Sequence, residues 1–138
     1  MAKVLFYIPA DTGIEEQIQR EIVFEVLSEE IEICRTIASL SARLLVFGNK
    51  PDIAVLFAVT RRELSALYSI RHLLSDLRFI IVLPDRQKDS VSLGHALYPR
   101  FLSYVDGDFK DVAAVLAKMT ENIRKEVSGT QAVNISYN

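Results

Sequence analysis

The sequence predicts one three-layer α/β domain in which a five-stranded parallel sheet lies between helices. Three observations lead to this class. Short apolar runs alternate five times with amphipathic segments along the 138 residues. Two of the amphipathic segments begin with the capping-box pattern that marks a helix start. The apolar runs near the middle of the chain contain no charged residue, which is typical of parallel strands that are covered on both faces.

The first unit combines a buried strand with an amphipathic helix. Residues 4–8 are aromatic, β-branched or leucine, and predict a strand that is buried on both faces. Thr12 and Glu15 form the first capping box, so a helix is expected to begin there. The inward stripe expected of this helix is Ile14, Ile18, Ile22 and Val26.

The second unit has a more polar strand. In residues 31–34 a glutamate interrupts the apolar residues, which suits a strand at the edge of a sheet. A helix is predicted over residues 36–47, and Gly48 is expected to end it in a left-handed conformation. Its predicted inward residues are Leu40, Leu44 and Phe47.

The third and fourth strands are wholly apolar. Residues 53–59 form the third strand, after which Thr60 and Glu63 repeat the capping box and predict a third helix. Residues 79–83 form the fourth strand, which Pro84 ends because proline has no N–H to donate. The turns of the third helix are marked by Leu64, Leu67, Arg71 and Leu74.

The last unit closes the domain. A short helix with a weak pattern is predicted around residues 91–97, followed by a strand over residues 101–105. Asp108 is expected to cap the final helix, whose inner stripe would be Val112, Val115, Leu116, Met119 and Ile123. Residues 127–138 show no helical period and are predicted to form a loose tail, so the domain is expected to span residues 1–126.

Five strand and helix pairs in strict alternation predict right-handed crossovers and a parallel sheet. The flavodoxin-like strand order 2-1-3-4-5 agrees best with the patterns. It places the partly charged second strand at an edge and the apolar first, third and fourth strands inside.

Composition limits the functional classes. The formal net charge of −2 gives no support to a nucleic-acid partner. Cys34 is the single cysteine, and no Cys/His group has metal-ligand spacing, so a reducing, cytoplasmic environment is expected. Neither a signal peptide nor an apolar run of the length of a membrane span is present, so no membrane association is expected.

Three segments, in their order and spacing, resemble parts of the receiver domains of two-component response regulators. ASLSARLLVFGNKPDIAVLF resembles the second helix and third strand of that family. RFIIVLPD resembles its fourth strand, and YVDGDF resembles the end of its fifth strand. The resemblance extends from residue 3 to about residue 125 and implies a signalling role.

Receiver chemistry takes place at the carboxyl ends of the strands, where ligands gather in such sheets. The resemblance implies five groups there: two acids that hold Mg²⁺, an aspartate that accepts a phosphoryl group, a Thr or Ser hydroxyl, and a lysine. This set is needed because in-line transfer to a carboxylate concentrates negative charge, which the cation and the donors offset.

In this sequence the five matching positions carry none of these groups. In chain order they are Pro9 and Ala10 for the acidic pair, Phe57 for the acceptor, Pro84 for the hydroxyl and Gly107 for the lysine. A phenyl ring, an imino acid and a glycine cannot accept phosphate, donate a hydroxyl or neutralise an oxyanion. We therefore expect a non-catalytic pseudo-receiver that is not phosphorylated on a receiver aspartate and acts through protein contacts. Phe57 is expected to fill the pocket, worth about 2 kcal/mol of burial.

Residues 95–104, HALYPRFLSY, are the candidate interface. In receivers the corresponding helix and strand belong to the face that carries output, usually by dimerisation, so a homodimer or another protein partner is expected here. Tyr and Arg are residues that anchor interfaces, although core packing also explains several of the aromatic residues. The candidate contact residues are His95, Tyr98, Arg100 and Tyr104.

The alternative function is a small-molecule or metal-binding sensor that uses the modified pocket at the strand ends. Asp11, Asp85 and Asp106 are expected near that edge, and oxygens from three loops suit Mg²⁺ or Ca²⁺. Aspartate is also common in loops because it caps and turns the chain, which is the simpler interpretation of the same residues. The sequence indicates no cofactor.

Overall fold

Five parallel strands form a single sheet in the order β2-β1-β3-β4-β5, as the sequence predicted. The structure is a computed structural model, and it describes the backbone of residues 1–137 and the side chains of residues 1–126. The strands are β1 (Lys3–Tyr7), β2 (Glu30–Cys34), β3 (Ile53–Phe57), β4 (Phe79–Leu83) and β5 (Phe101–Tyr104). Right-handed crossovers connect such strands, so the topology is flavodoxin-like.

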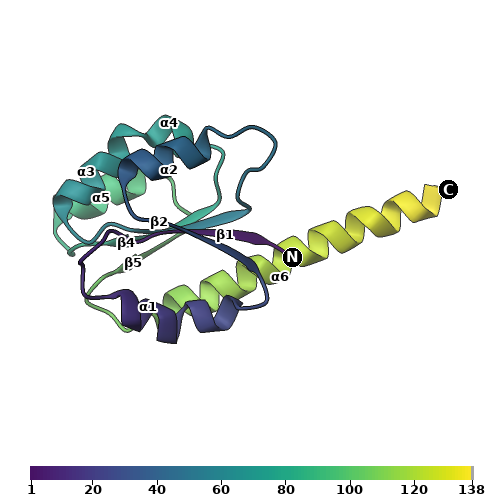
Figure 1. The fold of residues 1–138 in the computed structure, drawn as a ribbon, viewed down its shortest axis with the longest axis horizontal. Coiled ribbons are helices and arrows are strands. Elements are labelled where there is room, and N and C mark those ends of the chain that lie inside the picture. Colours follow the sequence, from purple (N-terminus) through teal and green to yellow (C-terminus); the bar gives the residue numbers. More distant parts are fainter. Residues whose placement is uncertain (138) are drawn as a thin grey trace.

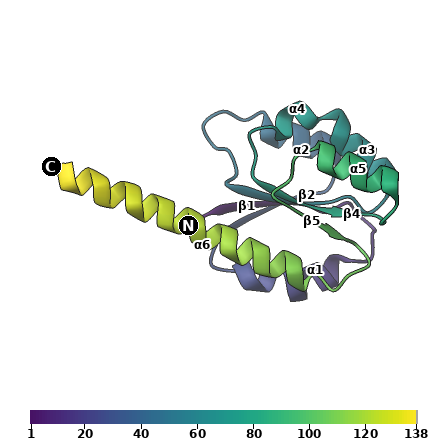
Figure 2. The ribbon, with the colours of Figure 1, turned by 180° about the vertical axis from the view of Figure 1, so that it is seen from behind.

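Helices cover both faces of the sheet. Figure 1 shows α2, α3, α4 and α5 on one face and α1 with α6 on the other, and Figure 2 shows the same layers from behind. The helices are α1 (Glu15–Glu21), the 3-10 helix η1 (Val23–Val26), α2 (Ile37–Leu44), α3 (Arg61–Ser69), α4 (Arg71–Leu74), α5 (Lys88–Ala96) and α6 (Lys110–Tyr137).

Two hydrophobic cores, one on each face, hold these layers together. Phe6 pairs with Val55 and Val55 with Ile80, so these three side chains point to the same face of the sheet. They pack with buried residues of α1 and α6, such as Ile18 and Leu116. The second core contains Leu5, Tyr7, Leu56 and Ile81 from the strands and Leu40, Leu64 and Leu97 from the helical layer. Because burial of each large apolar side chain contributes about 1.5–3 kcal/mol, the three central strands supply much of the stabilisation.

The strand β2 lies at one edge of the sheet, as its glutamate predicted. Glu30 and Glu32 are exposed, whereas Cys34 at the end of the strand is buried. Arg43 of α2 donates to Glu32 at 2.7 Å and covers part of this edge. Charged side chains on an edge strand disfavour pairing with a second sheet.

The first helix begins later than its capping-box pattern predicted. α1 starts at Glu15 with Ile14 as its N-cap and without a side-chain cap, so the prediction that Thr12 caps this helix is wrong. Asp11 and Gly13 both have a left-handed φ, of 60° and 78°, and the chain therefore turns on each side of Thr12 before the helix begins. The predicted stripe does face the core: Ile18, Ile22 and Val26 are buried, and Ile14 packs against them.

The second helix is shorter than predicted. It ends at Leu44, and the Phe47 side chain, predicted to face inward, is 95% exposed. Gly48 does have a left-handed φ of 77°, but it follows the helix end by several residues. The backbone N–H of Leu45 is shared between the carbonyls of Ser41 and Arg43, which tightens the last turn and directs the chain away from the core.

The predicted third helix is two helices, because the backbone at Ile70 leaves the helical region, with φ −106° and ψ 21°. Arg71, which was expected to mark a later turn of the third helix, is exposed and begins α4. The cap at its start is confirmed: the Thr60 hydroxyl accepts from the backbone N–H of Glu63 at 3.2 Å. Two other boundaries moved, since β3 ends at Phe57 and α5 begins at Lys88.

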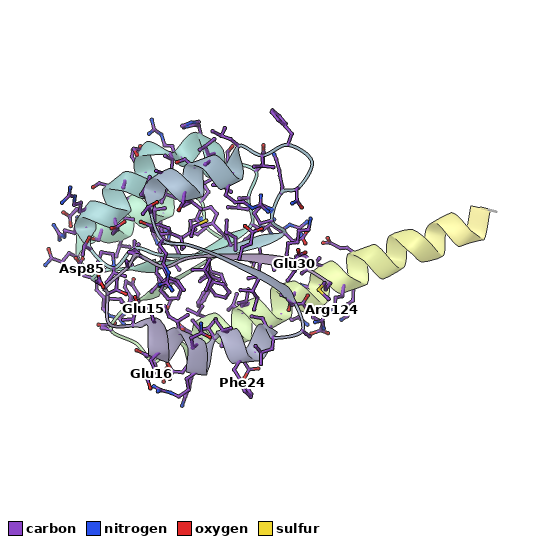
Figure 3. All side chains as sticks on the ribbon, viewed as in Figure 1. Glu15, Glu16, Phe24, Glu30, Asp85 and Arg124 are labelled. Atoms are coloured by element: carbon purple, nitrogen blue, oxygen red, sulfur yellow. The ribbon has the colours of Figure 1, made fainter. Side chains whose placement is uncertain are left out.

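An ion pair buried on one side anchors α6 to the sheet. The Glu29 carboxylate, whose side chain is 1% exposed, pairs with Arg124 of α6. It also accepts from the backbone N–H of Ala2 at 2.5 Å. Arg124 donates further to the Ser28 hydroxyl at 2.9 Å. Figure 3 shows Arg124 at the point where α6 leaves the sheet.

The last helix is longer than predicted. Asp108 accepts from the backbone N–H of Lys110 at 3.1 Å, at the expected helix start. The helix continues to Tyr137 and projects beyond the sheet (Figure 1), so the expectation of a loose, non-helical tail is wrong up to that residue. Extending a formed helix adds one hydrogen bond for each residue that is ordered, and no proline interrupts this segment. No helix within the described residues is both long enough and apolar enough to cross a membrane.

Candidate functional site

The carboxyl ends of the strands meet at one edge of the sheet. Phe57 pairs with Val82, and Leu83 pairs with Tyr104, so the segments after β3, β4 and β5 begin side by side. Figure 3 shows Asp85, which follows β4, and Glu15, which begins α1, at this edge. Ligands gather at such an edge in open α/β sheets, which makes it the first candidate site.

The five positions predicted from the resemblance all fall at or just beyond these strand ends. The structure places Pro9 and Phe57 in buried positions, Pro84 in a half-buried one, and Ala10 and Gly107 on the surface. None of the five can carry a charge or donate from a side chain. Their match to the receiver groups remains a prediction.

Phe57 is enclosed in the core. Its side chain is 0% exposed, and its ring meets the ring of Phe109 edge to face, with centroids 5.5 Å apart and an angle of 69° between the planes. Phe109 precedes α6, is equally buried, and has a left-handed φ of 60°. Such aromatic pairs contribute about 0.5–1.5 kcal/mol beyond their burial. The aromatic pair therefore connects the end of β3 with the start of α6.

The three candidate aspartates do not form a cation site. Asp85 accepts from Arg61 at 3.1 Å, and Asp106 accepts from Arg86 at 3.1 Å. Asp11 is exposed in its left-handed turn. Within the described residues, no three His, Cys, Asp or Glu side chains are placed to hold a metal ion. The positive charge beside Asp85 and Asp106 comes from arginine side chains and not from a metal-binding arrangement.

A hydrogen-bond network around Arg61 fixes the segment after β4. The guanidinium donates to Asp85, to Gln87 and, through two nitrogens at 2.9 and 3.0 Å, to Asp89. Hydrogen bonding to the Gln87 backbone N–H and to Ser90, with a further contribution from Arg61, lowers the pKa of Asp85. The hydrogen bond to Asp85 raises the pKa of Arg61. This role of Arg61 was not predicted, although two aspartates after one strand and an arginine at a neighbouring helix start were both visible in the sequence.

A second polar cluster lies at the ends of β1 and β2. The Tyr7 hydroxyl donates to the Glu63 carboxylate, and burial, followed by that hydrogen bond, raises the pKa of Tyr7 well above its usual value. A cavity of about 240 Å³ opens beside this pair, between Arg35 and Arg62. Arg35 also lies 3.7 Å from Glu15, whose pKa is lowered chiefly by a hydrogen bond from its own backbone N–H. From the sequence Tyr7 was predicted only as a buried strand residue, because its partner Glu63 is distant along the chain.

The candidate interface residues divide into two groups. His95, Tyr98 and Arg100 are exposed and lie where α5 ends and β5 begins. Tyr104 lies at the opposite end of β5, where the Arg86 guanidinium covers its ring at 3.9 Å from the centroid. Arg86 in turn pairs with Asp106, so Tyr104 belongs to the strand-end cluster. The structure does not bring Tyr104 together with the other three.

Several solved structures that are similar to this fold are receiver domains or response regulators. A CheY-like receiver domain protein from Methanospirillum hungatei has a TM-score of 0.64 and 14% identity, covering 91% of this chain and 99% of that protein. A CheY-like protein from Mesorhizobium loti has a TM-score of 0.67 and 11% identity, with 86% and 99% covered. The phosphorylated cyanobacterial phytochrome response regulator RcpA has a TM-score of 0.60 and 14% identity, with 88% and 93% covered.

Sequence comparison adds nothing to this likeness, since no family model and no curated protein matches the chain. At these identities the likeness establishes the fold: the chain folds as a receiver domain does.

Proposed function

We propose that this chain is a receiver-fold signalling or regulatory domain that is not phosphorylated at the strand ends and acts constitutively through protein contacts. The observation that carries the proposal is the enclosure of Phe57 against Phe109 at the end of β3. The resemblance to receivers matches Phe57 of this aromatic pair to their acceptor carboxylate, which supports the proposal.

The surrounding groups support the same proposal. Transfer of a phosphoryl group needs an acceptor, a cation and donors directed at the transferred oxygens. Here Asp85 and Asp106 are already neutralised by Arg61 and Arg86.

The proposed contact face is formed by α5, β5 and the first turns of α6. It includes His95, Tyr98 and Arg100, all exposed. The Tyr98 side chain is 87% exposed although its backbone has a left-handed φ of 57°. Residues held in sparsely populated backbone conformations cluster at functional sites, which supports this face. Its partner is a second copy of the chain or another protein.

Incubation with acetyl phosphate and Mg²⁺, followed by intact-mass measurement, tests the absence of phosphorylation. We expect no added mass, whereas the cyanobacterial phytochrome response regulator RcpA, which has been solved in a phosphorylated form, should gain a phosphoryl group as the reaction control. A stoichiometric adduct that hydroxylamine removes, as it removes acyl phosphates, would contradict the proposal.

Sedimentation velocity across a concentration series tests the contact face. Tyr98→Ala combined with Arg100→Ala should weaken any association by about 2 kcal/mol, because aromatic and arginine anchors carry the larger truncation costs. Circular dichroism of the same variant reports whether the fold is kept. A chain that stays monomeric at high micromolar concentration removes the homodimer version. If another protein binds the chain and its affinity is unchanged by both substitutions, the proposed contact face is excluded altogether.

A second candidate function, small-molecule sensing, is favoured by the cavity between Arg35 and Arg62. Two guanidinium groups beside a buried tyrosine suit a small carboxylate or phosphate compound. A thermal-shift series with acetate, citrate and inorganic phosphate tests it, with Arg62→Gln expected to abolish any stabilisation. If no compound raises the midpoint of unfolding, this candidate is excluded.

A further inference from the structure

Tyr98 occupies a backbone position that glycine usually takes. The helix α5 ends with hydrogen bonds from the N–H of Leu97 to Gly94 and from the N–H of Tyr98 to His95, at 3.2 and 3.0 Å. Tyr98 itself has a left-handed φ of 57°, which is the conformation of the residue that follows a helix and is unfavourable for a side chain with a β-carbon. Because the ring is 87% exposed, its burial within the chain does not offset this strain.

A cavity of about 350 Å³ lies beside the exposed ring, between α4 and the end of α5. Leu97, which is buried, and Ala96 form its apolar wall. Arg71 and Ser75 line the α4 side, and the Ser75 hydroxyl donates to the carbonyl of His72 at 3.2 Å. The cavity therefore offers an aromatic edge, an aliphatic wall and one cation.

The cation is held in place but not neutralised. The Arg71 guanidinium stacks on the ring of Tyr68, 4.4 Å from its centroid, and donates to the carbonyl of the same residue at 3.1 Å. Among the side chains that the structure describes, no carboxylate forms an ion pair with Arg71, whereas the neighbouring arginines Arg61 and Arg78 each have one. Asp76 is adjacent to Ser75 in the sequence but does not line the cavity.

We propose that this cavity binds an acidic segment of a partner protein. A carboxylate of that segment pairs with Arg71, and a neighbouring apolar side chain packs against Leu97, Ala96 and the ring of Tyr98. A guanidinium already positioned by stacking loses little freedom when it binds a carboxylate. The inference rests on the proposed function, because it names the chemistry of the partner that meets the contact face at Tyr98.

Charge favours an acidic protein segment over a second copy of the chain or nucleic acid as the ligand of this cavity. A symmetric contact with a second copy, centred on this cavity, would bring Arg71 of one copy close to Arg71 of the other, which like charges oppose. Nucleic acid would require several phosphate contacts, and the net charge of the chain is −2. An acidic protein segment can pair with Arg71 and pack against the apolar wall at the same time.

An NMR titration tests the proposal, with backbone amide shifts as the readout. The probe is the acetylated and amidated tetrapeptide Glu-Leu-Phe-Glu, and the matched control is Gln-Leu-Phe-Gln. We expect the acidic peptide alone to shift the amides of Ser75, Ala96, Leu97 and Tyr98. Arg71→Gln should raise its dissociation constant by about tenfold or more, since a charge-assisted hydrogen bond is lost. Arg20→Gln, on the opposite layer, should leave the dissociation constant unchanged.

Several results overturn the proposal. These are equal shifts with both peptides, no shift with either, or undiminished binding by Arg71→Gln. Shifts of the same amides when the chain alone is concentrated would identify a second copy as the occupant. Failure of the proposed function would be recognised by a different measurement. A phosphoryl adduct would contradict that function, but it would not change the Arg71-dependent amide shifts. Absence of these shifts would contradict the cavity proposal, but it would not change the result of the adduct test.

Discussion

The rings of Phe57 and Phe109 lie 5.5 Å apart, centroid to centroid, and meet edge to face at the junction of β3 and α6. Both side chains are 0% exposed. The end of the central strand is therefore joined to the last helix by apolar packing. In a domain that is phosphorylated at this strand end, the added negative charge would disrupt this packing between the strand and the helix.

Phe57→Asp should destabilise the domain by about 2–4 kcal/mol, because the variant buries a carboxylate that has no cation or lysine beside it. It should also remain unphosphorylated in acetyl phosphate. Urea denaturation followed by circular dichroism measures the first effect. Phe57→Leu is the matched control, since it keeps apolar burial and should cost only about 1 kcal/mol. An unchanged midpoint for the aspartate variant would mean that the ring contributes nothing to stability.

Tyr98→Gly should stabilise the domain by about 0.5–1 kcal/mol, because glycine adopts the left-handed backbone without a β-carbon clash. Tyr98→Ala keeps the β-carbon and should give no such gain, which separates backbone strain from loss of the ring. Chemical denaturation of the three proteins measures the difference. If the glycine and alanine variants are equally stable, strain at residue 98 is not the explanation of its unusual backbone.

Stability should fall at alkaline pH through Tyr7. Burial and Glu63 raise the pKa of its hydroxyl in the folded state, whereas the unfolded chain has the ordinary value of about 10. The stabilising contribution is therefore fully present below pH about 10 and is lost as the pH rises toward the folded value. Urea midpoints at pH 7 and pH 11 should differ less for Tyr7→Phe than for the original chain. An identical pH dependence of the two proteins would show that Tyr7 titrates alike in both states.

Arg124→Ala should destabilise the domain by about 3 kcal/mol, because it leaves the buried Glu29 carboxylate without its cation. Arg20→Ala is the control: its ion pair with Glu16 is exposed and should be worth less than about 1 kcal/mol. Thermal unfolding of both variants in the same buffer provides the comparison. Equal effects of the two substitutions would show that Glu29 is hydrated rather than buried.

Features that depend on neighbours along the chain were predictable. The strand order and the buried stripe on α1 follow from hydrophobic periodicity, which reports the buried face whatever packs against it. The burial of Phe57 followed in the same way, from its place in an uninterrupted apolar run. The cap at Thr60 was also visible, because its hydroxyl reaches a backbone N–H only three residues away.

The same local patterns were insufficient where the backbone conformation depends on a turn. Thr12 has the same pattern as Thr60, but the left-handed Asp11 and Gly13 separate it from its helix. Phe47 fits a helical period, yet its helix ends before it. In both cases periodicity indicated a buried or capped position that the chain does not reach.

The sequence by itself thus determined the layers and the strand order, since both depend on residue type and local spacing. Only the tertiary structure decided which polar side chains meet. Tyr7 and Glu63 are 56 residues apart in the chain, and Arg61 and Asp89 are 28 residues apart. Contacts of this kind require an approach to hydrogen-bonding distance, which is set by how helices pack on the sheet and leaves no periodic trace in the sequence.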